Sequence, residues 1–490
     1  MIKPGDVYDR EPEWASLTSF VGSNRPGATL GLVYGRRRQG KTYLLQALTE
    51  AAGGLYFAAL KQSSDQNLAR LADAYRQVTG SRARVAFGSW TEAVESLLAL
   101  GQSSTGSFPV VLDEFPYLLA TAPELPSVVQ ALLSPRGEAA TRWPTRLVLC
   151  GSALSTMRGL LSGTAPLRGR ASLELVVRPF DYRVAAHYWG VDADPELAFR
   201  LHALVGGTPA YLDMCGGAGP TSSAEFDAWV ARVLLNPASA MFREGNVLLS
   251  EEEGLVDTSL YFSVLSAISH GQHRRGEIAA SIGRPQTAIA HPLAVLTEAG
   301  LVAPQLDALR QKRSVFHVAE PVLRLHQLVI APHEPRLARH RGPQVWESLA
   351  DTVGSKIYGP HFETIARSWC SDWASPATLG GTASVVATTE IACREHRSSH
   401  EVDVVVRETN PGAPDRIVAL GEAKWNSRPV DLAELRWLEH LRDLLGPAGA
   451  SVQTRLLLFS RRGFTADVDR EAGTRDDVEL VDLPRLYRGD

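Results

Sequence analysis

Apolar runs of strand length alternate with amphipathic helical segments through the first half of the chain. The apolar runs are residues 30–35 (LGLVYG), 54–60 (GLYFAAL), 108–113 (FPVVLD) and 146–152 (RLVLCGS), and residues 41–51 have the spacing of an amphipathic helix. Buried strands separated by helices are typical of a parallel sheet with helices on both of its faces. The pattern predicts a doubly wound α/β fold for this part of the chain.

The second half changes pattern twice. Around residues 237–249 the periodicity becomes helical, and the proline-rich, basic residues 331–343 are typical of a linker. Beyond them, helical segments at 359–369 and 431–446 accompany strand patterns at 384–392, 401–407, 416–424, 454–460 and 478–483. This predicts a second, smaller α/β domain, and we expect three domains, at residues 1–250, 251–341 and 342–490.

Composition excludes few functions. The 490 residues carry a formal net charge of -4, which gives no overall attraction to nucleic acid or membrane. The N-terminus lacks an apolar segment of signal-peptide length and no run of 18 apolar residues follows, so we expect a cytoplasmic protein without membrane spans. The four cysteines are far apart and form no CxxC pair, which predicts neither a disulfide framework nor a zinc site.

The segment GRRRQGKT has the spacing of a phosphate-binding loop and lies between a predicted strand and a predicted helix. Its glycines allow successive backbone N–H groups to face a phosphate, and the helix N-terminus adds partial positive charge. We expect Lys41 to bridge the β- and γ-phosphates of ATP and the Thr42 hydroxyl to bind Mg²⁺. The predicted nucleotide-binding residues are Gly35, Arg36, Arg37, Arg38, Gln39, Gly40, Lys41 and Thr42.

Other residues at strand ends complete this predicted ATP site. Asp113 follows four apolar residues and is the expected second magnesium ligand, and the adjacent Glu114 is the expected base for the attacking water. Ser152 ends another strand and is a candidate γ-phosphate sensor, although a turn-forming Gly-Ser pair would look the same. Arg168 and Arg170 precede a further strand; Arg170 is the first candidate for an arginine finger, in cis or in trans.

Six segments in order resemble the archaeal-type ATPase family of P-loop proteins, which lies close to the AAA+ and STAND ATPases. They are YDREPEWASL, GRRRQGKT, VVLDEFPYLL, LVLCGSALSTM, PLRGR with RPF, and GGTPAYL, spread over residues 8–212. The resemblance implies that residues 9–17 lie near the nucleobase and residues 206–211 in a helical lid. It also implies a C-terminal domain of unknown function (DUF234) that is nuclease-like.

Residues 258–341 form a basic middle segment, with ten arginines and lysines against five acidic residues. Two short helical patterns after a first helix, followed by KRSVFHV, resemble a winged helix-turn-helix. In DNA-binding versions the third helix enters the major groove and the wing contacts phosphates. Suitable residues are Arg284, Gln286, Thr287, Lys312 and Arg313. The same fold also serves as a protein-interaction module or a lid, so both roles stay open.

A last group of polar residues lies in the predicted C-terminal domain. Glu422 and Lys424 are two apart on one strand and therefore share a face; an isolated pair of this kind is usually a surface ion pair. The preceding strand, connected by a turn-rich segment, is expected to set Asp403 beside Glu422, and two adjoining carboxylates favour a divalent cation between them. Glu363, on an upstream helix, is a further candidate ligand.

The order helix Glu, strand Asp, strand Glu-x-Lys resembles a PD-(D/E)XK nuclease core over roughly residues 354–490. The leading hypothesis is therefore a Mg²⁺-dependent ATPase that couples nucleotide state to a DNA-binding, nuclease-like C-terminal domain, in DNA processing or defence. The alternative is a STAND-like signalling switch whose winged helix and inert tail bind protein partners. Assembly into a homo-oligomer is left open.

Overall fold

The computed structural model describes residues 1–104, 106–250, 258–310, 314–410, 412 and 414–490. The chain divides into two compact units: residues 1–179 with 208–210, and residues 180–207 with 211–490. The domain boundaries that the sequence predicts, near residues 250 and 341, remain predictions. Among the described residues, none of the helices combines the length and apolar character that a membrane crossing requires.

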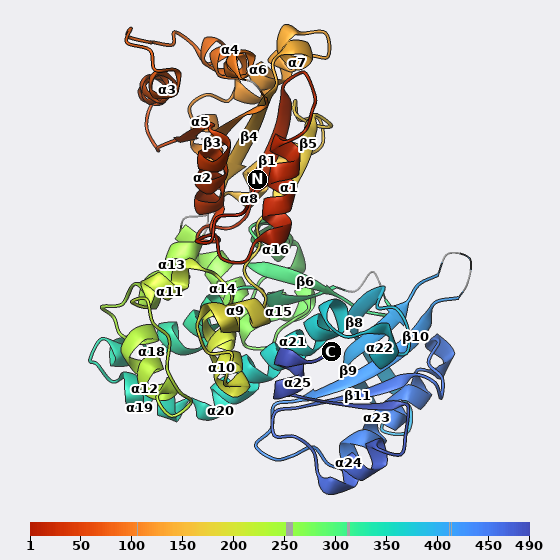
Figure 1. The fold of residues 1–490 in the computed structure, drawn as a ribbon. Helices are drawn as coiled ribbons and strands as arrows, with labels where there is room; N and C mark the ends of the chain where they lie inside the picture. The colour runs from red at the N-terminus through yellow and green to blue at the C-terminus, as the bar shows by residue number, and fades with distance from the viewer. Residues whose placement is uncertain (105, 251–257, 311–313, 411, 413) are drawn as a thin grey trace. The chain divides into compact units, whose positions relative to one another are not determined.

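The first unit is built on a five-stranded sheet. Its strands are β1 (Thr29–Tyr34), β2 (Leu55–Ala58), β3 (Phe108–Asp113), β4 (Thr145–Gly151) and β5 (Ala171–Val176); β1, β3, β4 and β5 are labelled in Figure 1. Their order is β2-β3-β4-β1-β5, and every neighbouring pair is parallel. The predicted parallel α/β sheet is confirmed, and the carboxyl ends of its strands lie at one edge.

Both faces of this sheet are covered by helices because successive strand residues point to opposite sides. Val33 and Val111 pack with Leu44 and Leu48 on one face, whereas Leu32 contributes to the core on the other. The first face is covered by α1 (Glu11–Val21) and α2 (Lys41–Ala52). The second core includes α3 (Ser64–Thr79), α4 (Trp90–Ala99), α5 (Phe115–Leu119), α6 (Leu125–Leu132), α7 (Glu138–Arg142) and α8 (Leu154–Gly159).

The second unit begins with helices. They include α9 (Tyr182–Tyr188), α10 (Pro195–Val205), α11 (Ala210–Met214), α12 (Phe226–Trp229), α13 (Ala240–Ser250), α17 (Pro321–Leu325), α18 (Ala331–Leu337), α19 (Gly342–Ser348) and α20 (Ala350–Val353). The linker predicted at 331–343 is wrong, because α18 and α19 occupy most of it. α18 continues the helical run of Pro321–Leu325 and His326–Ile330, so Pro332 lies within a helix, and Leu337 is buried in the core.

Residues 258–318 fold as three helices and a two-stranded hairpin where they are described. The elements are α14 (Thr258–Ser269), α15 (Arg275–Ser281), α16 (Gln286–Glu298), β6 (Val302–Leu306) and β7 (Ser314–Val318). β6 and β7 are antiparallel, and Leu265, Ile278, Leu293 and Val302 share one core. The predicted second and third helices are confirmed, whereas Lys312 and Arg313 lie outside the described residues.

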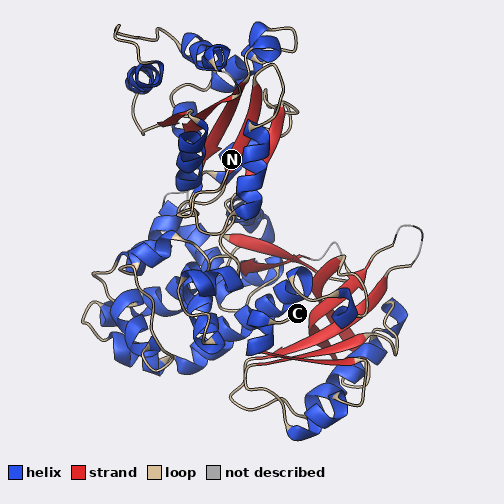
Figure 2. Ribbon diagram, viewed as in Figure 1, coloured by secondary structure: helices blue, strands red, loops and turns tan. Residues whose placement is uncertain are grey.

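The chain ends in a mixed five-stranded sheet, drawn as the arrows of the C-terminal region in Figure 2. Its strands are β8 (Val385–Cys393), β9 (Ser398–Glu408), β10 (Arg416–Lys424), β11 (Arg455–Ser460) and β12 (Val478–Asp482), in the order β12-β11-β10-β9-β8. One face packs on α21 (Gly359–Asp372) and α25 (Leu483–Arg488), with α22 (Pro376–Leu379) nearby in the chain, and the other on α23 (Leu432–Leu444) and α24 (Ala466–Ala472). The predicted smaller α/β domain has these elements.

The pairing of β9 with β10 fixes which residues meet across this sheet. The two strands are antiparallel, and Val404 pairs with Gly421. In an antiparallel register the residue before Val404 then lies opposite the residue after Gly421. The predicted hairpin is therefore confirmed, and Asp403 lies beside Glu422.

Candidate functional site

The loop that joins β1 to α2 has the backbone of a phosphate-binding turn. A side chain at Gly35 would place its Cβ 2.2 Å from the Val177 carbonyl oxygen, so this position accepts only glycine without a backbone shift. Gly40 has φ of 84°, which is a left-handed conformation that glycine adopts without strain, and it leads directly into α2. The loop thus ends at a helix N-terminus, which favours bound anions.

Lys41 is the first residue of α2 and is 6% exposed. Its Nζ donates hydrogen bonds to the carbonyl oxygens of Gly35 at 2.7 Å and Arg36 at 2.8 Å. Burial lowers the pKa of the Lys41 ammonium. The side chain therefore folds back over the loop, at the place where an anion on the helix N-terminus would meet it.

Asp113 ends β3 and receives hydrogen bonds from two hydroxyl groups. Thr42 Oγ1 donates to its Oδ2 at 2.8 Å, and Tyr56 Oη donates to the same oxygen at 2.6 Å. The predicted pair Thr42 and Asp113 is brought together, and their oxygen atoms are the ligand type that Mg²⁺ prefers. Tyr56 was missed; it lies on β2, the strand that neighbours β3, and its position could have been found from strand alternation.

Glu114 is the next residue and has φ of 51°, an uncommon left-handed conformation for a residue other than glycine. Its backbone N–H donates to Asp113 Oδ1 at 2.8 Å. Ser152 Oγ, at the end of β4, donates to Glu114 Oε2 at 3.0 Å. The predicted Ser152 thus meets the predicted base Glu114, a link that the sequence did not reveal because the two residues are 38 positions apart.

The arginines of the loop differ in their surroundings. Arg37 Nη2 donates to the Tyr117 hydroxyl at 2.7 Å, and Arg36 is buried at 8% exposure. Gln39 is also buried, and its carbonyl oxygen accepts a hydrogen bond from Arg10 Nη2 at 3.1 Å. Arg10 lies just before α1, so the N-terminal segment of the resemblance contacts the phosphate loop. Arg38 has φ of 69°.

Arg170 does not lie near this loop in its own chain. It comes just before β5, and Ala171 pairs with Leu30 at the start of β1, whereas the loop follows the end of β1. The length of the sheet, roughly 20 Å for six residues, separates them. Arg170 Nη1 instead donates to the Leu133 carbonyl oxygen at 3.3 Å. The predicted role of Arg170 as an arginine finger in cis is therefore wrong, and a role in trans stays a prediction. Arg168 also precedes β5, at the edge of the sheet opposite the phosphate loop.

In the second unit, three carboxylates lie close enough to perturb one another. Asp403 on β9 accepts a hydrogen bond from the Ala423 N–H at 2.9 Å, next to Glu422 on β10. Glu422 is 6% exposed, and its Oε2 has no hydrogen-bond partner among the described residues. Such an orphaned buried oxygen is costly unless a ligand satisfies it. Glu363 on α21 completes the group, which we call the carboxylate cluster: Glu363, Asp403 and Glu422.

The pKa values of the carboxylate cluster reflect this crowding. Burial, and next the Asp403 carboxylate, raise the pKa of Glu363. The same two causes, in the same order, raise the pKa of Glu422. Burial raises the pKa of Asp403 against the opposing hydrogen bond from Ala423. The cluster therefore resists full ionisation on its own, and a divalent cation would remove that resistance.

Four further charged side chains border the carboxylate cluster; one is Glu401, which adds to the effect of burial and Asp403 on the pKa of Glu363. Lys424 Nζ donates to Glu422 Oε1 and lies 3.7 Å from Glu434 Oε2. Burial is the largest single effect and opposes the charge of Lys424, but the Glu422, Glu434 and Asp403 carboxylates together outweigh it, so the pKa of Lys424 is raised. Arg367 Nη1 donates to the Asp403 carbonyl oxygen at 2.8 Å. Arg367 was missed, although it lies four residues after Glu363 on one helix face.

Most of the described basic side chains of the middle segment are exposed. Arg284, Gln286 and Thr287 are exposed at the start of α16. In contrast, Arg324 is buried and donates to the Val318 carbonyl oxygen at 3.1 Å, and Arg274 forms ion pairs with Glu277 and Glu390. Exposed arginines also lie elsewhere in the segment, at positions 275, 310, 336, 339 and 341, and the start of α16 is one of several exposed polar regions.

Comparison with known proteins agrees with the geometry of the first unit. Residues 7–213 match the family model of an ATPase domain found predominantly in archaea. An uncharacterized protein of Methanocaldococcus jannaschii, MJECL04, is 22% identical over 329 residues, which cover 66% of this chain and 69% of that protein.

Solved structures resemble the chain at the level of fold. The Walker-type ATPase paby2304 of Pyrococcus abyssi has a TM-score of 0.50 at 19% identity and covers 66% of this chain and 97% of its own. The Aeropyrum pernix ORC2 protein, in ADPNP–ADP complexes, has a TM-score of 0.42 at 16% identity. The match covers 71% of this chain and 96% of that chain. The family match, the parallel sheet and the phosphate loop together support an archaeal P-loop ATPase domain at residues 7–213.

Proposed function

We propose that the first unit binds ATP with Mg²⁺ and hydrolyses it. The backbone of the loop from Gly35 to Gly40 would hold the phosphates, with Lys41 neutralising the β- and γ-phosphate charge. Thr42 and Asp113 would hold the metal, whose positive charge stabilises the charge that develops on the phosphate oxygens. Glu114 would position and deprotonate the attacking water.

The observation that carries this proposal is the chain of contacts from Thr42 through Asp113 to Glu114 and Ser152. Thr42 Oγ1 and Asp113 Oδ2 are 2.8 Å apart, and Glu114 follows directly in a left-handed conformation that turns its side chain toward Ser152. The hydrogen bond from Ser152 supports a second role for this serine, in which it orients the base. Such a hydroxyl could exchange between Glu114 and the terminal phosphate.

The test is a pair of variants in single-turnover and steady-state ATPase assays. Glu114→Gln keeps the size and hydrogen-bonding ability of the side chain but removes the base, so we expect ATP binding to persist and turnover to fall by about 100-fold or more. Lys41→Ala should weaken ATP binding itself. If the parent protein binds ATP but hydrolyses almost none of it, Glu114→Gln cannot lower the rate further. That result would instead favour an ATP-dependent signalling switch.

For the second unit we propose a PD-(D/E)XK nuclease-like site. The carboxylate cluster would bind Mg²⁺, and Lys424 would orient or deprotonate the attacking water and balance charge on the phosphate in flight. The orphaned Glu422 Oε2 and the raised pKa values of the cluster support a cation there, since both are relieved when a divalent cation binds. The order Glu363, Asp403, Glu422, Lys424 along the elements agrees with the resemblance.

We propose in addition that residues 258–318 act as a winged helix that contacts DNA through α16. The exposed residues Arg284, Gln286 and Thr287 at its N-terminal end suit base and phosphate contacts. Under this proposal, nucleotide state in the ATPase unit would be coupled to DNA engagement by the second unit. Phosphate contacts should make the affinity fall steeply with added salt.

Supercoiled plasmid provides the direct test of the nuclease-like site. The parent protein is incubated with plasmid and Mg²⁺ or Mn²⁺, with and without ATP, beside Asp403→Ala. We expect nicking or linearisation by the parent only. If Asp403→Ala cuts as well as the parent, the assigned site is wrong, and if neither protein cuts, the nuclease proposal for this site fails. DNA binding that is absent or insensitive to salt would favour protein partners.

A further inference from the structure

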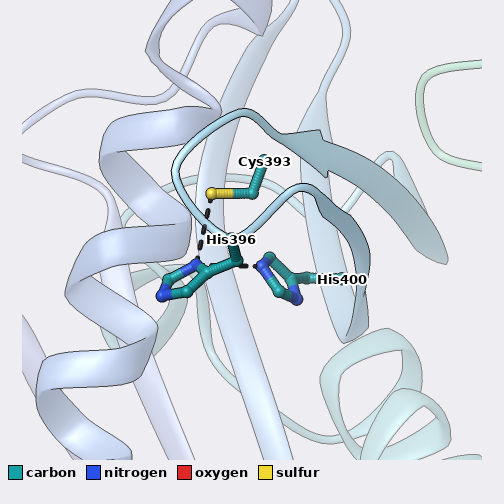
Figure 3. Close-up of side chains that lie close together, drawn as sticks. All are labelled: Cys393, His396 and His400. Carbon is teal, nitrogen blue, oxygen red and sulfur yellow. Dashed lines mark hydrogen bonds between the residues drawn. The ribbon is translucent and has the colours of Figure 1, made fainter.

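Four side chains with nitrogen or sulfur ligands converge at the turn of the β8–β9 hairpin. Cys393 is the last residue of β8, His396 lies in the turn, and His400 lies on β9. Cys393 Sγ lies 3.3 Å from His396 Nδ1, and His400 Nε2 lies 3.2 Å from the same nitrogen. Figure 3 draws both contacts as dashed lines. His440, on α23, brings its Nε2 to 3.6 Å from Cys393 Sγ.

Three of the six separations between the ligand atoms, Cys393–His396, His396–His400 and Cys393–His440, are close to the edges of a zinc coordination tetrahedron. With zinc–sulfur bonds of about 2.3 Å and zinc–nitrogen bonds of about 2.05 Å, tetrahedral geometry places sulfur about 3.6 Å from nitrogen and two nitrogens about 3.3 Å apart. The ligand atoms of Cys393, His396 and His400 all lie within 4.8 Å of one another. A cation would therefore need only side-chain rotations of small size to reach all three.

The chemistry of the cluster selects the cation. Thiolate and imidazole ligands favour zinc and similar transition metals, whereas Mg²⁺ and Ca²⁺ prefer oxygen. Cys393 is 3% exposed, and His396 and His400 are more open, so the site is anchored in the fold but accessible from one side. Glu395 forms a second triad with Cys393 and His440, which offers an alternative oxygen ligand.

An indole ring supports the histidines from the helix side. Trp437 lies on α23, with its ring centroid 4.6 Å from that of His400 and 5.5 Å from that of His440, the latter in a stacked arrangement. These contacts restrict the two imidazoles before any cation binds, which reduces the entropy that binding costs. β8 is also an edge strand of its sheet and has a neighbouring strand on one side only. A cation that links its end to α23 would therefore stabilise the position of this strand.

We propose that Cys393, His396 and His400, with His440 as the fourth ligand, form a structural zinc site that fastens the β8–β9 hairpin to α23. The sequence predicted no zinc site because the cysteines lie far apart, and folding supplies histidines in place of a second cysteine. The zinc site shares no residue with the carboxylate cluster. On binding, the thiol proton of Cys393 is released to solvent and the three imidazoles bind as neutral ligands.

Cobalt substitution tests the proposal on the full-length chain. Protein stripped with a chelator and kept reduced with a phosphine is titrated with Co²⁺. We expect one equivalent to produce a thiolate-to-cobalt charge-transfer absorption, which Zn²⁺ then abolishes by displacement. Cys393→Ser should lose this absorption, whereas Cys215→Ser, a matched control in the helical region, should keep it. Absence of the absorption in the parent, or its persistence in Cys393→Ser, overturns the proposal.

A second set of variants separates coordination from ordinary packing. His440→Gln and His396→Gln should each lower cobalt affinity by at least about tenfold, with unchanged circular dichroism and ATP binding. Asp403→Ala should leave the thiolate absorption intact, because Asp403 belongs to the carboxylate cluster and is not a ligand of the zinc site. If Zn²⁺ raises the unfolding temperature of His440→Gln as much as that of the parent, His440 is not a ligand and the four-ligand site is refuted.

Discussion

The carboxylate cluster gives the most demanding prediction, through the substitution Asp403→Asn. Asp403 lies opposite Glu422 on paired strands, and like charges in that position destabilise a sheet. The amide side chain has nearly the same shape and can still accept the hydrogen bond from the Ala423 N–H. The substitution therefore removes one charge from the cluster and little else.

The size of the effect follows from the charges. Two carboxylates about 5 Å apart repel by about 3 kcal/mol at an effective dielectric constant of about 20. Lys424 and Arg367 offset part of this repulsion, and the hydrogen bond from Ala423 weakens by about 1 kcal/mol when its acceptor loses charge. We expect Asp403→Asn to be about 1 kcal/mol more stable than the parent at pH 8 in the absence of divalent cations.

The dependence on pH has a definite sign. The folded pKa values of Glu363 and Glu422 are raised above their ordinary value of 4.5, so between that value and the folded pKa the folded chain binds more protons than the unfolded chain. The stabilisation from these groups should therefore be fully present below about pH 4.5 and be lost as pH rises from there through the folded pKa values. Asp403→Asn should flatten this slope and differ little from the parent at pH 5.

Added Mg²⁺ should reverse the order of the two proteins at pH 8. A cation at 100 times its dissociation constant stabilises the parent by about 2.7 kcal/mol, and it should not stabilise Asp403→Asn to a similar degree. Urea unfolding in the absence of nucleotide measures the stability difference between Asp403→Asn and the parent. It is carried out at pH 5 and pH 8, each with and without Mg²⁺. Asp476→Asn, an exposed turn residue, is the control. Equal Mg²⁺ stabilisation of Asp403→Asn and the parent would refute the reasoning.

Two further substitutions test the fold around the sites. Gly35→Ala forces a Cβ to 2.2 Å from the Val177 carbonyl oxygen and should cost about 1–3 kcal/mol and weaken ATP binding, measured by thermal unfolding and calorimetry; Gly5→Ala, with open space around it, should do neither. Asp477→Asn removes a carboxylate whose pKa Arg475 lowers to about 2, so it should cost about 1 kcal/mol at pH 7. That cost should disappear as pH falls from about 4 toward 2, and a cost that persists at pH 2 would contradict the ion-pair explanation.

The local order of strand, loop and helix was readable from the sequence. Residues 30–42 carry an apolar strand, a glycine turn and a helix start in succession, so the phosphate loop needed no long-range information. Asp113 could be placed across from it because parallel strands end at one edge of their sheet. Asp403 and Glu422 could also be paired, since the connection between their strands favoured a hairpin whose register follows from strand alternation.

Other features depended on the tertiary structure. Arg170 has a basic, loop-like context typical of a finger, but only the pairing of β5 with β1 shows that it lies at the far edge of the sheet. Tyr56 and Ser152 join the ATP site through hydrogen bonds to Asp113 and Glu114. These partners are 57 and 38 positions away in the sequence. The prolines at 332 and 335 predicted a linker, whereas packing of Leu337 in the core favours a helix there.

The sequence by itself determined the elements that consecutive residues specify: the parallel sheet, the phosphate loop, the strand-end carboxylates and the three helices of the middle segment. Only the tertiary structure decided which side chains from distant segments meet, as Cys393 meets His440 from α23. The physical reason is that hydrophobic periodicity and turn chemistry act over a few residues. The meeting of distant side chains depends instead on strand register and helix packing, which are fixed by the whole core at once.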